Sequence, residues 1–425
     1  MIFKNIVGVL TLCSVVSIGW AGDEQNAADD SAFLRMKSEK GLIALEVAVQ
    51  TLTSCQPDAP EVLLVGVAHI AEASFYEGID DILSSAEVVL YESVLPAGAD
   101  RPSGETEEQR IETTQASMAF VGSLLAWSEQ VEGASPKTLA ELGVSIKKLD
   151  ARMERWLQEA SVDAWGQPLI YVPATQDSPW ELISLGSDGV SGGDASAADL
   201  QLKNSSDIQA PATSGDHGLQ GRLADALGLA FQLESLPYDN LSWRCSDLTF
   251  DRLARRAKER GFELDSLADT LAGSSLPSKF VKTILAAIPM LDAMAGGRVT
   301  DALKVMMIEV LSDETMIEAS MNYLGEGFAE VIINDRNEAV MDDLAEIIRE
   351  EPDVKSVAIL YGAGHMQDFL VRLKERFCYQ PIKKQWLIAM EVDLNKSALS
   401  RMELAQIRVA MKRMLDMTKS QMESQ

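Results

Sequence analysis

Glu61-Val-Leu-Leu-Val-Gly66 and Val88-Val-Leu-Tyr91 are two short, uninterrupted apolar runs, and they decide the fold. Runs of branched side chains without polar alternation are typical of strands that are buried on both faces of a sheet. Between them the spacing becomes helical over residues 72–85, where four apolar residues share one side: Phe75, Ile79, Ile82 and Leu83. The order strand, helix, strand predicts a β-α-β unit with parallel strands and a right-handed crossover.

The rest of the chain adds helices and two more strands. Helical spacing returns in four segments, residues 106–128, 137–160, 223–350 (with breaks) and 367–376. The apolar residues 354–361 and 386–392 are further strand candidates. We therefore expect an α/β protein, with a mostly parallel sheet flanked by helices and a large helical middle section, in one domain over residues 55–392.

The composition is that of a folded, acidic protein. Among the 425 residues, 47% are hydrophobic and 24% are charged, which are ordinary values for a globular chain and exclude wholesale disorder. The net charge of −28 argues against nucleic acid or an anionic membrane as the main partner, because such a surface repels phosphates. It favours divalent cations in the vicinity without choosing a site for them.

Residues 1–22 are predicted to be a signal peptide. Lys4 supplies the positive start, residues 6–18 are apolar, and Gly19-Trp20-Ala21 offers small residues to a signal peptidase. The apolar run is shorter than the roughly 20 residues that span a bilayer. We expect an exported protein, periplasmic or secreted, and an uncleaved membrane anchor is the alternative.

Two other segments differ from the rest of the chain. Residues 187–218 are rich in Ser, Gly, Asp and Ala and have almost no large apolar side chains, so we expect a disordered insertion. Residues 396–425 predict a Met-rich, locally basic amphipathic helix. We expect this helix to dock on its own domain, and a contact with a partner or a membrane is the alternative.

Outside the predicted signal peptide the chain has three cysteines, Cys55, Cys245 and Cys378. An odd number allows at most one disulfide and leaves one thiol free. Which pair forms, if any, stays open. There is no C-x-x-C motif, so the sequence does not support a cysteine-based zinc site.

Two of the three histidines occupy the same local position. Gly66-Val-Ala-His69 and Gly362-Ala-Gly-His365 each follow an apolar strand and precede a helix. Glycine permits a tight turn at the carboxyl end of a strand, and ligands bind at that edge of an open α/β sheet. Two imidazoles at one edge suit divalent-metal ligation or acid–base chemistry. The alternative is that each histidine only caps its helix or fills a turn; His217, in the predicted insertion, is taken as incidental.

Glu92 directly follows the second apolar run. If the two strands of the β-α-β unit are neighbours, its carboxylate lies on the same rim as His69. There it can be a metal ligand or a general base for a water molecule. Two histidines and a glutamate with an open position fit a catalytic metal site better than a closed structural one. A carboxylate that faces solvent is the alternative.

At these residues the chain resembles the TraB/GumN family, which includes the Tiki metalloproteases. The resemblance covers roughly residues 60–390. Three short elements carry it: Leu63-Leu-Val-Gly-Val-Ala-His-Ile through Glu92, Gly228-Leu-Ala-Phe-Gln-Leu-Glu-Ser-Leu-Pro-Tyr-Asp239 with Arg244-Cys-Ser-Asp-Leu248, and Asp335-Arg-Asn-Glu-Ala-Val-Met341 before Ile359-Leu-Tyr-Gly-Ala-Gly-His365. The first element departs from the family in Val67, where a threonine commonly follows the glycine. The middle one departs in Cys245 and Ser246, where the family often has His-Ala, and this puts a role for Asp247 in doubt.

The resemblance implies that His69, Glu92 and His365 are metal-site residues. It also implies that Arg336 orients a carboxylate or stabilises an oxyanion, whereas an ordinary helix salt bridge is the alternative for that residue. The expected function is a divalent-metal-dependent hydrolase, most plausibly a peptidase, that uses manganese, cobalt or zinc on a peptide or small-molecule substrate. Two alternatives stay open: an esterase-like hydrolase that uses histidine as its base without metal, and a non-catalytic protein that binds and sequesters peptides.

Overall fold

The computed structural model describes residues 32–150, 152–205, 208, 210, 218–261, 288–312 and 330–422. The predicted signal peptide and His217 lie outside the described residues. The chain divides into two compact units. The sheet unit comprises residues 1–93, 216–247 and 256–425, and the insert unit comprises residues 94–215 and 248–255.

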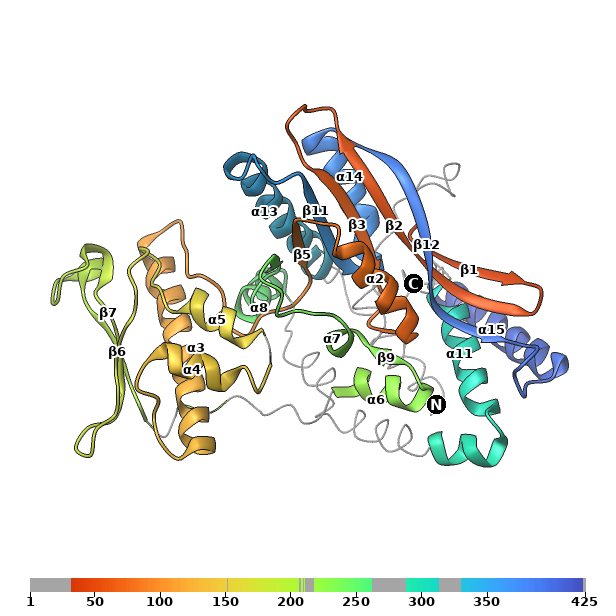
Figure 1. Ribbon diagram of the computed structural model, residues 1–425, viewed down its shortest axis with the longest axis horizontal. Helices are drawn as coiled ribbons and strands as arrows, with labels where there is room; N and C mark the ends of the chain where they lie inside the picture. Colours follow the sequence, from red (N-terminus) through yellow and green to blue (C-terminus); the bar gives the residue numbers. More distant parts are fainter. Residues whose placement is uncertain are drawn as a thin grey trace. The chain divides into compact units, whose positions relative to one another are not determined.

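A mixed sheet forms the centre of the sheet unit (Figure 1). Its seven strands in the described residues are β1 (Leu34–Glu39), β2 (Leu42–Ser54), β3 (Glu61–Val67), β5 (Val88–Tyr91), β10 (Trp243–Cys245), β11 (Ser356–Gly362) and β12 (Tyr379–Asp393). The order is β1-β2-β3-β11-β5-β10, and β12 pairs with β2. The pairs β3–β11, β11–β5 and β5–β10 are parallel, whereas β1, β3 and β12 each run antiparallel to β2. The α/β class is confirmed, but the expectation of a mostly parallel sheet is wrong, because the long β2–β12 ribbon adds an antiparallel half.

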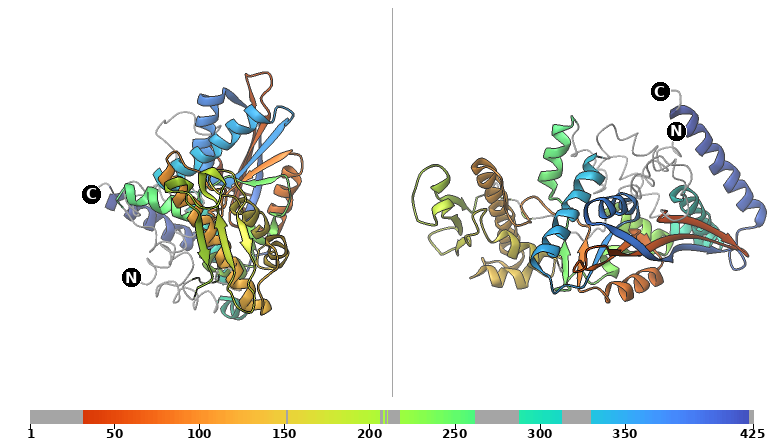
Figure 2. Two further views of the ribbon diagram at one scale, coloured as in Figure 1. Left: turned by 90° about the vertical axis from the view of Figure 1, so that its left-hand side faces the viewer. Right: turned by 90° about the horizontal axis from the view of Figure 1, so that it is seen from above.

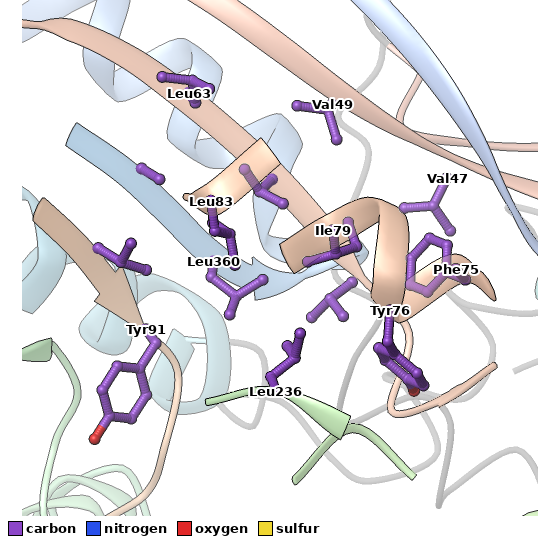
Figure 3. Close-up of a cluster of buried hydrophobic side chains, with 14 of the residues drawn as sticks. Val47, Val49, Leu63, Phe75, Tyr76, Ile79, Leu83, Tyr91, Leu236 and Leu360 are labelled. Atoms are coloured by element: carbon purple, nitrogen blue, oxygen red, sulfur yellow. The ribbon is translucent and has the colours of Figure 1, made fainter. Parts of the chain in front are cut away.

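The parallel strands are buried on both faces, as their apolar runs predict. The helix α2 (Ala73–Leu83) covers one face of the parallel strands, and α13 (Arg336–Glu350) and α14 (Met366–Phe377) cover the other (Figure 2). Leu63 and Val65 of β3 belong to the core cluster on the α2 side, and Val62 and Leu64 belong to the cluster on the α13 and α14 side. Figure 3 shows the α2 side of this core. Because successive side chains of a strand point to opposite faces, two helical layers require a continuous apolar run rather than an alternating one.

The two strands of the predicted β-α-β unit exist at the predicted residues, with α2 between them in sequence. They are parallel, but they are not neighbours, since β11 lies between β3 and β5. Residues 356–362 carry an apolar run that is buried on both faces, and only a central position in the sheet provides two apolar layers for it. The strand from the far end of the chain therefore takes the place between the first two.

Other elements complete the sheet unit. They are the β4–β9 pair (Ile70–Ala71 and Ala230–Phe231), α6 (Gly218–Leu227), α7 (Gln232–Ser235), α11 (Arg298–Leu311), the π-helical segment η3 (Glu330–Asp335), the 3-10 turn η4 (Ala363–His365) and α15 (Arg401–Met422); α8 (Phe250–Glu259) belongs partly to each unit. On α15, Leu404 and Ile407 pack with Ile308 of α11, and Arg408 donates to Glu309 at 2.5 Å. The expected docking of the C-terminal helix on its own domain is confirmed for these residues.

The insert unit combines helices with a small sheet. Its elements are α3 (Glu107–Glu132), α4 (Leu139–Ile146), α5 (Met153–Ala160), β6 (Ile170–Val172), β7 (Glu181–Ser184), the 3-10 turns η1 (Gly186–Asp188) and η2 (Ala195–Ala197), and β8 (Leu200–Lys203). Residues 137–160 thus form two helices rather than one. The prediction of disorder over residues 187–218 is wrong for β8, which pairs antiparallel with β7. Leu202 packs against Gly122 of α3, so backbone pairing and a few leucines order a segment whose composition is otherwise polar.

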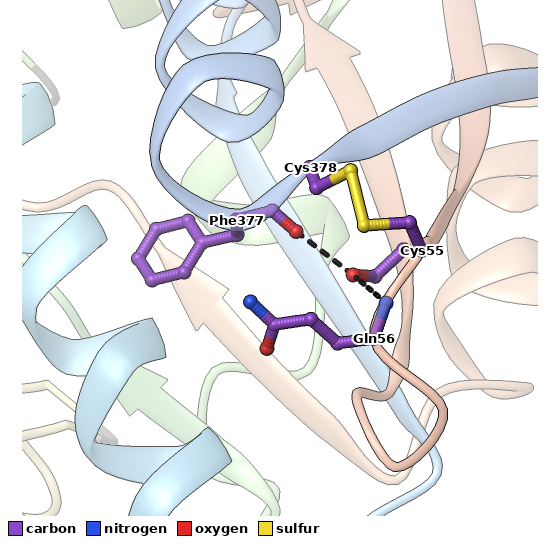
Figure 4. The surroundings of a disulfide bond; sticks show 5 residues. Cys55, Gln56, Phe377 and Cys378 are labelled. Atoms are coloured by element: carbon purple, nitrogen blue, oxygen red, sulfur yellow. Dashed lines mark hydrogen bonds between the residues drawn. A yellow bond between two sulfur atoms is a disulfide. The ribbon is translucent and has the colours of Figure 1, made fainter.

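A disulfide joins Cys55, just after β2, to Cys378, between α14 and β12, with the Cα atoms 5.6 Å apart (Figure 4). Beside it, the Ser54 hydroxyl donates to the carbonyl oxygen of Phe377 at 2.8 Å. Cys245 is the free thiol among the described cysteines. The expectation of at most one disulfide with one thiol left over is confirmed. In the part of the chain that the structure describes, no helix is both long and apolar enough to cross a membrane.

Candidate functional site

The candidate site lies where three parallel strands end. His69 comes two residues after β3, Glu92 directly after β5, and His365 ends the turn η4 that follows β11. The carboxyl ends of parallel strands lie at one edge of a sheet, so the three side chains are brought to one rim. Nε2 of His365 lies 3.8 Å from Oε1 of Glu92, and the charge of His69 helps to lower the pKa of Glu92. The rim is the one that the sequence predicts, although β11, and not β3, is the direct neighbour of β5.

Glu92 is buried and both of its carboxylate oxygens are hydrogen-bonded. Oε1 accepts from Nη2 of Arg336 at 2.7 Å, and Oε2 accepts from the backbone N–H of Gly362 at 2.7 Å. Burial opposes ionisation of Glu92, but the charges of Arg336 and of the two histidines, together with the Gly362 N–H, outweigh it and lower its pKa to about 2. The carboxylate therefore stays anionic at every physiological pH.

Arg336 starts α13 with only 1% of its side chain exposed. Its Nε and Nη2 donate to the two oxygens of Asp247 at 2.9 and 2.6 Å, and Nη2 also donates to Glu92. Its Nη1 donates to the carbonyl oxygen of Ile332 at 3.4 Å. Burial opposes its charge, but Asp247 and Glu92 raise the pKa of Arg336 well above its usual range. With its donors used in this way, Arg336 is placed to orient carboxylates.

His365 is completely buried. Its ring lies 5.1 Å from that of Tyr361 and stacks on Phe369, with the centroids 6.2 Å apart. Nδ1 contacts Oδ1 of Asn337 at 2.6 Å. Nε2 has no hydrogen-bond partner, and the Oε1 atom of Glu92 lies 3.8 Å from it. Burial lowers the pKa of His365 to about 3, despite the opposing charge of Glu92, so the imidazole is neutral.

His69 is only half-buried. Its Nδ1 contacts Oε1 of Gln232 at 2.6 Å, and the backbone N–H of Gln232 donates to the carbonyl oxygen of His69 at 3.0 Å. Nε2 of Gln232 donates in turn to the Tyr238 hydroxyl at 2.8 Å. Each histidine of the site thus has its Nδ1 on a side-chain amide and its Nε2 on the opposite side of the ring. Metal-binding histidines commonly show this arrangement.

Sequence reasoning missed the two amides. Gln232 and Asn337 stand in the quoted elements, Asn337 directly after Arg336, but an amide carries no charge and has no motif spacing of its own. Asp247, whose role was in doubt, is fully buried against Arg336 and also accepts from the backbone N–H of Ser93 at 3.0 Å. The available signal was position, because both amides lie inside sequence elements that had already been singled out.

The candidate site does not contain a preformed set of three metal ligands among the described residues. Among the described residues, no three His, Cys, Asp or Glu side chains are arranged to hold one ion. The two oxygens of Glu92 accept from Arg336 and from the backbone N–H of Gly362. Each of these oxygens still has a second lone pair, so the hydrogen bonds do not exclude ligation.

Comparison with known proteins gives one match. The family model for the type II secretion system protein G matches residues 102–203, which is less than half of the chain and lies in the insert unit. No curated protein and no solved structure matches the chain at a significant level. A match to a secretion-system protein and a disulfide both fit the expected export of this chain.

This finding contradicts the resemblance to the TraB/GumN family, because the family model that matches is a different one, over residues 102–203. The elements that carried the resemblance are short. A glycine turn that ends a buried strand and presents a polar side chain is a general solution at the edge of parallel sheets, so it does not identify one family. These short elements therefore do not assign the chain to a family.

Proposed function

We propose that the site at the ends of β3, β5 and β11 binds a divalent cation and hydrolyses its substrate, with peptide bonds as the first substrate class to test. The observation that carries the proposal is the buried, unpartnered Nε2 of His365. A buried polar atom without a partner costs roughly 1–3 kcal/mol, and such an atom in an otherwise well-paired cluster indicates a ligand position.

The charges of the cluster favour a metal cation over a proton as that ligand. The pKa of His365 is lowered to about 3, so near neutral pH the ring carries only one proton and one of its nitrogens keeps a free lone pair. Glu92 and Asp247 are both paired with the single positive charge of Arg336, which leaves the buried cluster with one negative charge in excess. The two positive charges of a divalent cation between the histidines and Glu92 would offset this excess, and a bound hydroxide would bring the sum to zero.

The donor set suits zinc, cobalt or manganese. His69 and His365 offer imidazole nitrogens and Glu92 a carboxylate oxygen, which is the composition of an open catalytic site rather than a closed structural one. Bound there, such an ion would lower the pKa of a coordinated water and so provide hydroxide at neutral pH.

The residues of the chain have separable roles in this proposal. Glu92, with its pKa lowered to about 2, suits a permanently anionic ligand better than a proton acceptor. Arg336 holds Glu92 in place and is itself held by Asp247, and this orienting role is favoured over a contact with the oxyanion of the substrate because Nε and Nη2 of Arg336 already donate to the two carboxylates. His69 is the more exposed of the two imidazoles and is the one we place next to the substrate.

We also propose that the protein works in the periplasm or outside the cell. The Cys55–Cys378 disulfide supports this location, because disulfides persist in oxidising compartments. The match to a secretion-system protein points in the same direction. The acidic surface makes a peptide or a small molecule a better substrate than a nucleic acid.

The test combines metal content with affinity. Mass spectrometry on dialysed mature protein and calorimetric titration with manganese, cobalt and zinc should show a single bound ion. His69→Ala, His365→Ala and Glu92→Gln should each lower the affinity, and His217→Ala is the matched control that should not. Two of these changes combined should lose much less than the sum, because one lost ligand already disables the site.

Two outcomes would change the proposal. If His69→Ala, His365→Ala and Glu92→Gln all bind the ion as tightly as the wild type, the site is not a metal centre. If Glu92→Gln alone binds normally but hydrolyses none of the peptides that the wild type cleaves, Glu92 is the base and not a ligand.

A further inference from the structure

We infer that Asp368, which does not touch the site, determines which ring nitrogen of His365 carries the proton, and that it acts through Asn337. Asp368 lies in the first turn of α14, three residues after His365. Its Oδ2 accepts from Nδ2 of Asn337 at 2.8 Å. The benefit of this arrangement for ion binding rests on the proposed function. The tautomer itself does not, because it follows from hydrogen bonds within the metal-free protein.

The orientation of the Asn337 amide is fixed by its partners. Nδ2 faces the carboxylate of Asp368 and, at 3.3 Å, the carbonyl oxygen of His365. Both partners can only accept, so the NH2 group must point toward them. The other end of the amide, Oδ1, must then face Nδ1 of His365 at 2.6 Å, and since Oδ1 can only accept, Nδ1 must donate.

The proton on Nδ1 leaves Nε2 as a lone pair directed into the site. This is the atom that the structure leaves without a partner beside Glu92. A free imidazole in water prefers the other tautomer, in which Nε2 carries the hydrogen and cannot bind a cation. Asp368 and Asn337 are therefore positioning residues that convert His365 into a ligand before any ion arrives.

The hydrogen bonds around His69 do not fix its tautomer in the same way. The NH2 group of Gln232 contacts the Tyr238 hydroxyl, which can donate as well as accept. Turning the Gln232 amide over would leave both of its hydrogen bonds possible with the roles reversed, so the tautomer of His69 is not dictated in the same way. The carboxylate behind Asn337 is what makes His365 different.

Asp368 itself is held by Arg372, whose Nε donates to it at 2.5 Å, and Arg372 also pairs with Glu338 at 2.5 Å. Glu338 thus provides a matched control. Glu338→Ala removes a carboxylate from the same arginine, but Glu338 makes no contact with the Asn337 amide among the described residues. Asp368→Ala removes a carboxylate from both.

The experiment uses the full-length, metal-free protein labelled with ¹⁵N-histidine. The chain has only three histidines, so each ring can be assigned by its own single substitution. In the wild type we expect His365 with a protonated Nδ1 and an unprotonated Nε2. In Asp368→Ala a population with the proton on Nε2 should appear, and the zinc affinity should fall by about 10-fold. Glu338→Ala should show the wild-type spectrum and affinity.

A double variant tests the direction of the effect. Asn337→Asp combined with Asp368→Asn exchanges amide and carboxylate, so the group next to Nδ1 can still only accept, and the wild-type tautomer should return. The inference is overturned if wild-type His365 carries its proton on Nε2, or if Asp368→Ala and Glu338→Ala give the same spectrum. If Asp368→Ala does not fold, the wild-type spectrum and the exchange variant decide. If the wild type shows the expected tautomer but binds no ion, the proposed function fails and this inference stands.

Discussion

The two Gly-x-x-His turns begin as near copies in sequence and end in different environments. His365 is fully buried, stacks on Phe369, and has its tautomer fixed by an amide backed by a carboxylate. His69 is half-buried, and its amide partner is backed by a tyrosine hydroxyl. The same local pattern therefore produces one rigid and one adaptable imidazole on a single rim.

The difference follows from where each strand lies. β11 is central, with β3 and β5 on its two sides and α13 and α14 packed against it, so the turn that follows it is enclosed. The turn after β3 continues into the short β4–β9 pair. Two-strand pairs of this length contribute little rigidity of their own. The His365 turn is therefore part of the core, whereas the His69 turn is less enclosed.

The largest effect should come from breaking the buried ion cluster on the rigid side. Arg336→Leu leaves Glu92 and Asp247 buried without their counter-charge, which typically costs about 3–5 kcal/mol. The matched control is Arg244→Leu, which breaks a bidentate pair with Glu351 at the surface, where each side chain is 36% exposed. That change should cost about 0–1 kcal/mol.

Urea denaturation followed by circular dichroism would measure both variants. Similar losses of unfolding free energy in Arg336→Leu and Arg244→Leu would mean that the cluster is open to water in solution. The His365 side of the site would then not be the rigid one. A loss in Arg336→Leu that disappears when Glu92 and Asp247 are also replaced by Gln and Asn would confirm that the unpaired charge is the cause.

The next effect separates the two histidines by stability. His365→Ala opens a cavity between Tyr361 and Phe369 and should cost about 1–3 kcal/mol, whereas His69→Ala, at a half-exposed position, should cost less than about 1 kcal/mol. The sequence pattern treats the two histidines alike, at the ends of two strands, whereas the structure buries only His365 completely. Thermal unfolding of the metal-free variants would show the difference, and equal melting temperatures would remove it.

The strands of the sheet were predictable because each has to satisfy two apolar layers. Residues 61–67, 88–91 and 356–362 are continuous apolar runs, and no other local structure buries such short runs on both sides. Their order in the sheet was not predictable, since nothing local in residues 356–362 states that they insert between two earlier strands. The β2–β12 ribbon was predicted only in part: residues 386–392 were expected as a strand, but the exposed residues 380–383 of β12 carry no apolar run, and this end of the strand is held by pairing with β2.

The site shows the same division. The two histidines and Glu92 were found because each stands just after an apolar run, whereas Arg336 was singled out only by the resemblance. The amides were not found, because Gln232 and Asn337 acquire a role only from what lies behind them, Tyr238 in one case and Asp368 in the other. The amides themselves lie 163 residues from His69 and 28 residues from His365, and no local sequence pattern connects them with the histidines.

The smallest effect should come from replacing the amide partner of His69, and the ratio of its effect to that of the corresponding change at His365 compares the two histidines directly. Asn337→Leu removes the acceptor for Nδ1 of His365, and because both residues are fully buried no water molecule takes its place, so zinc affinity should fall by about 10–100-fold. Gln232→Leu removes the corresponding acceptor for His69, but a half-exposed ring can take a water molecule in its place, so the loss should be only about 2–5-fold. Calorimetric titration of the two variants, with Asn204→Leu in the insert unit as a control for losing an amide, would measure the ratio. A larger loss in Gln232→Leu than in Asn337→Leu would reverse the assignment. The His69 side would then be the rigid half of the site, and the carboxylate behind Asn337 would have no bearing on ion binding.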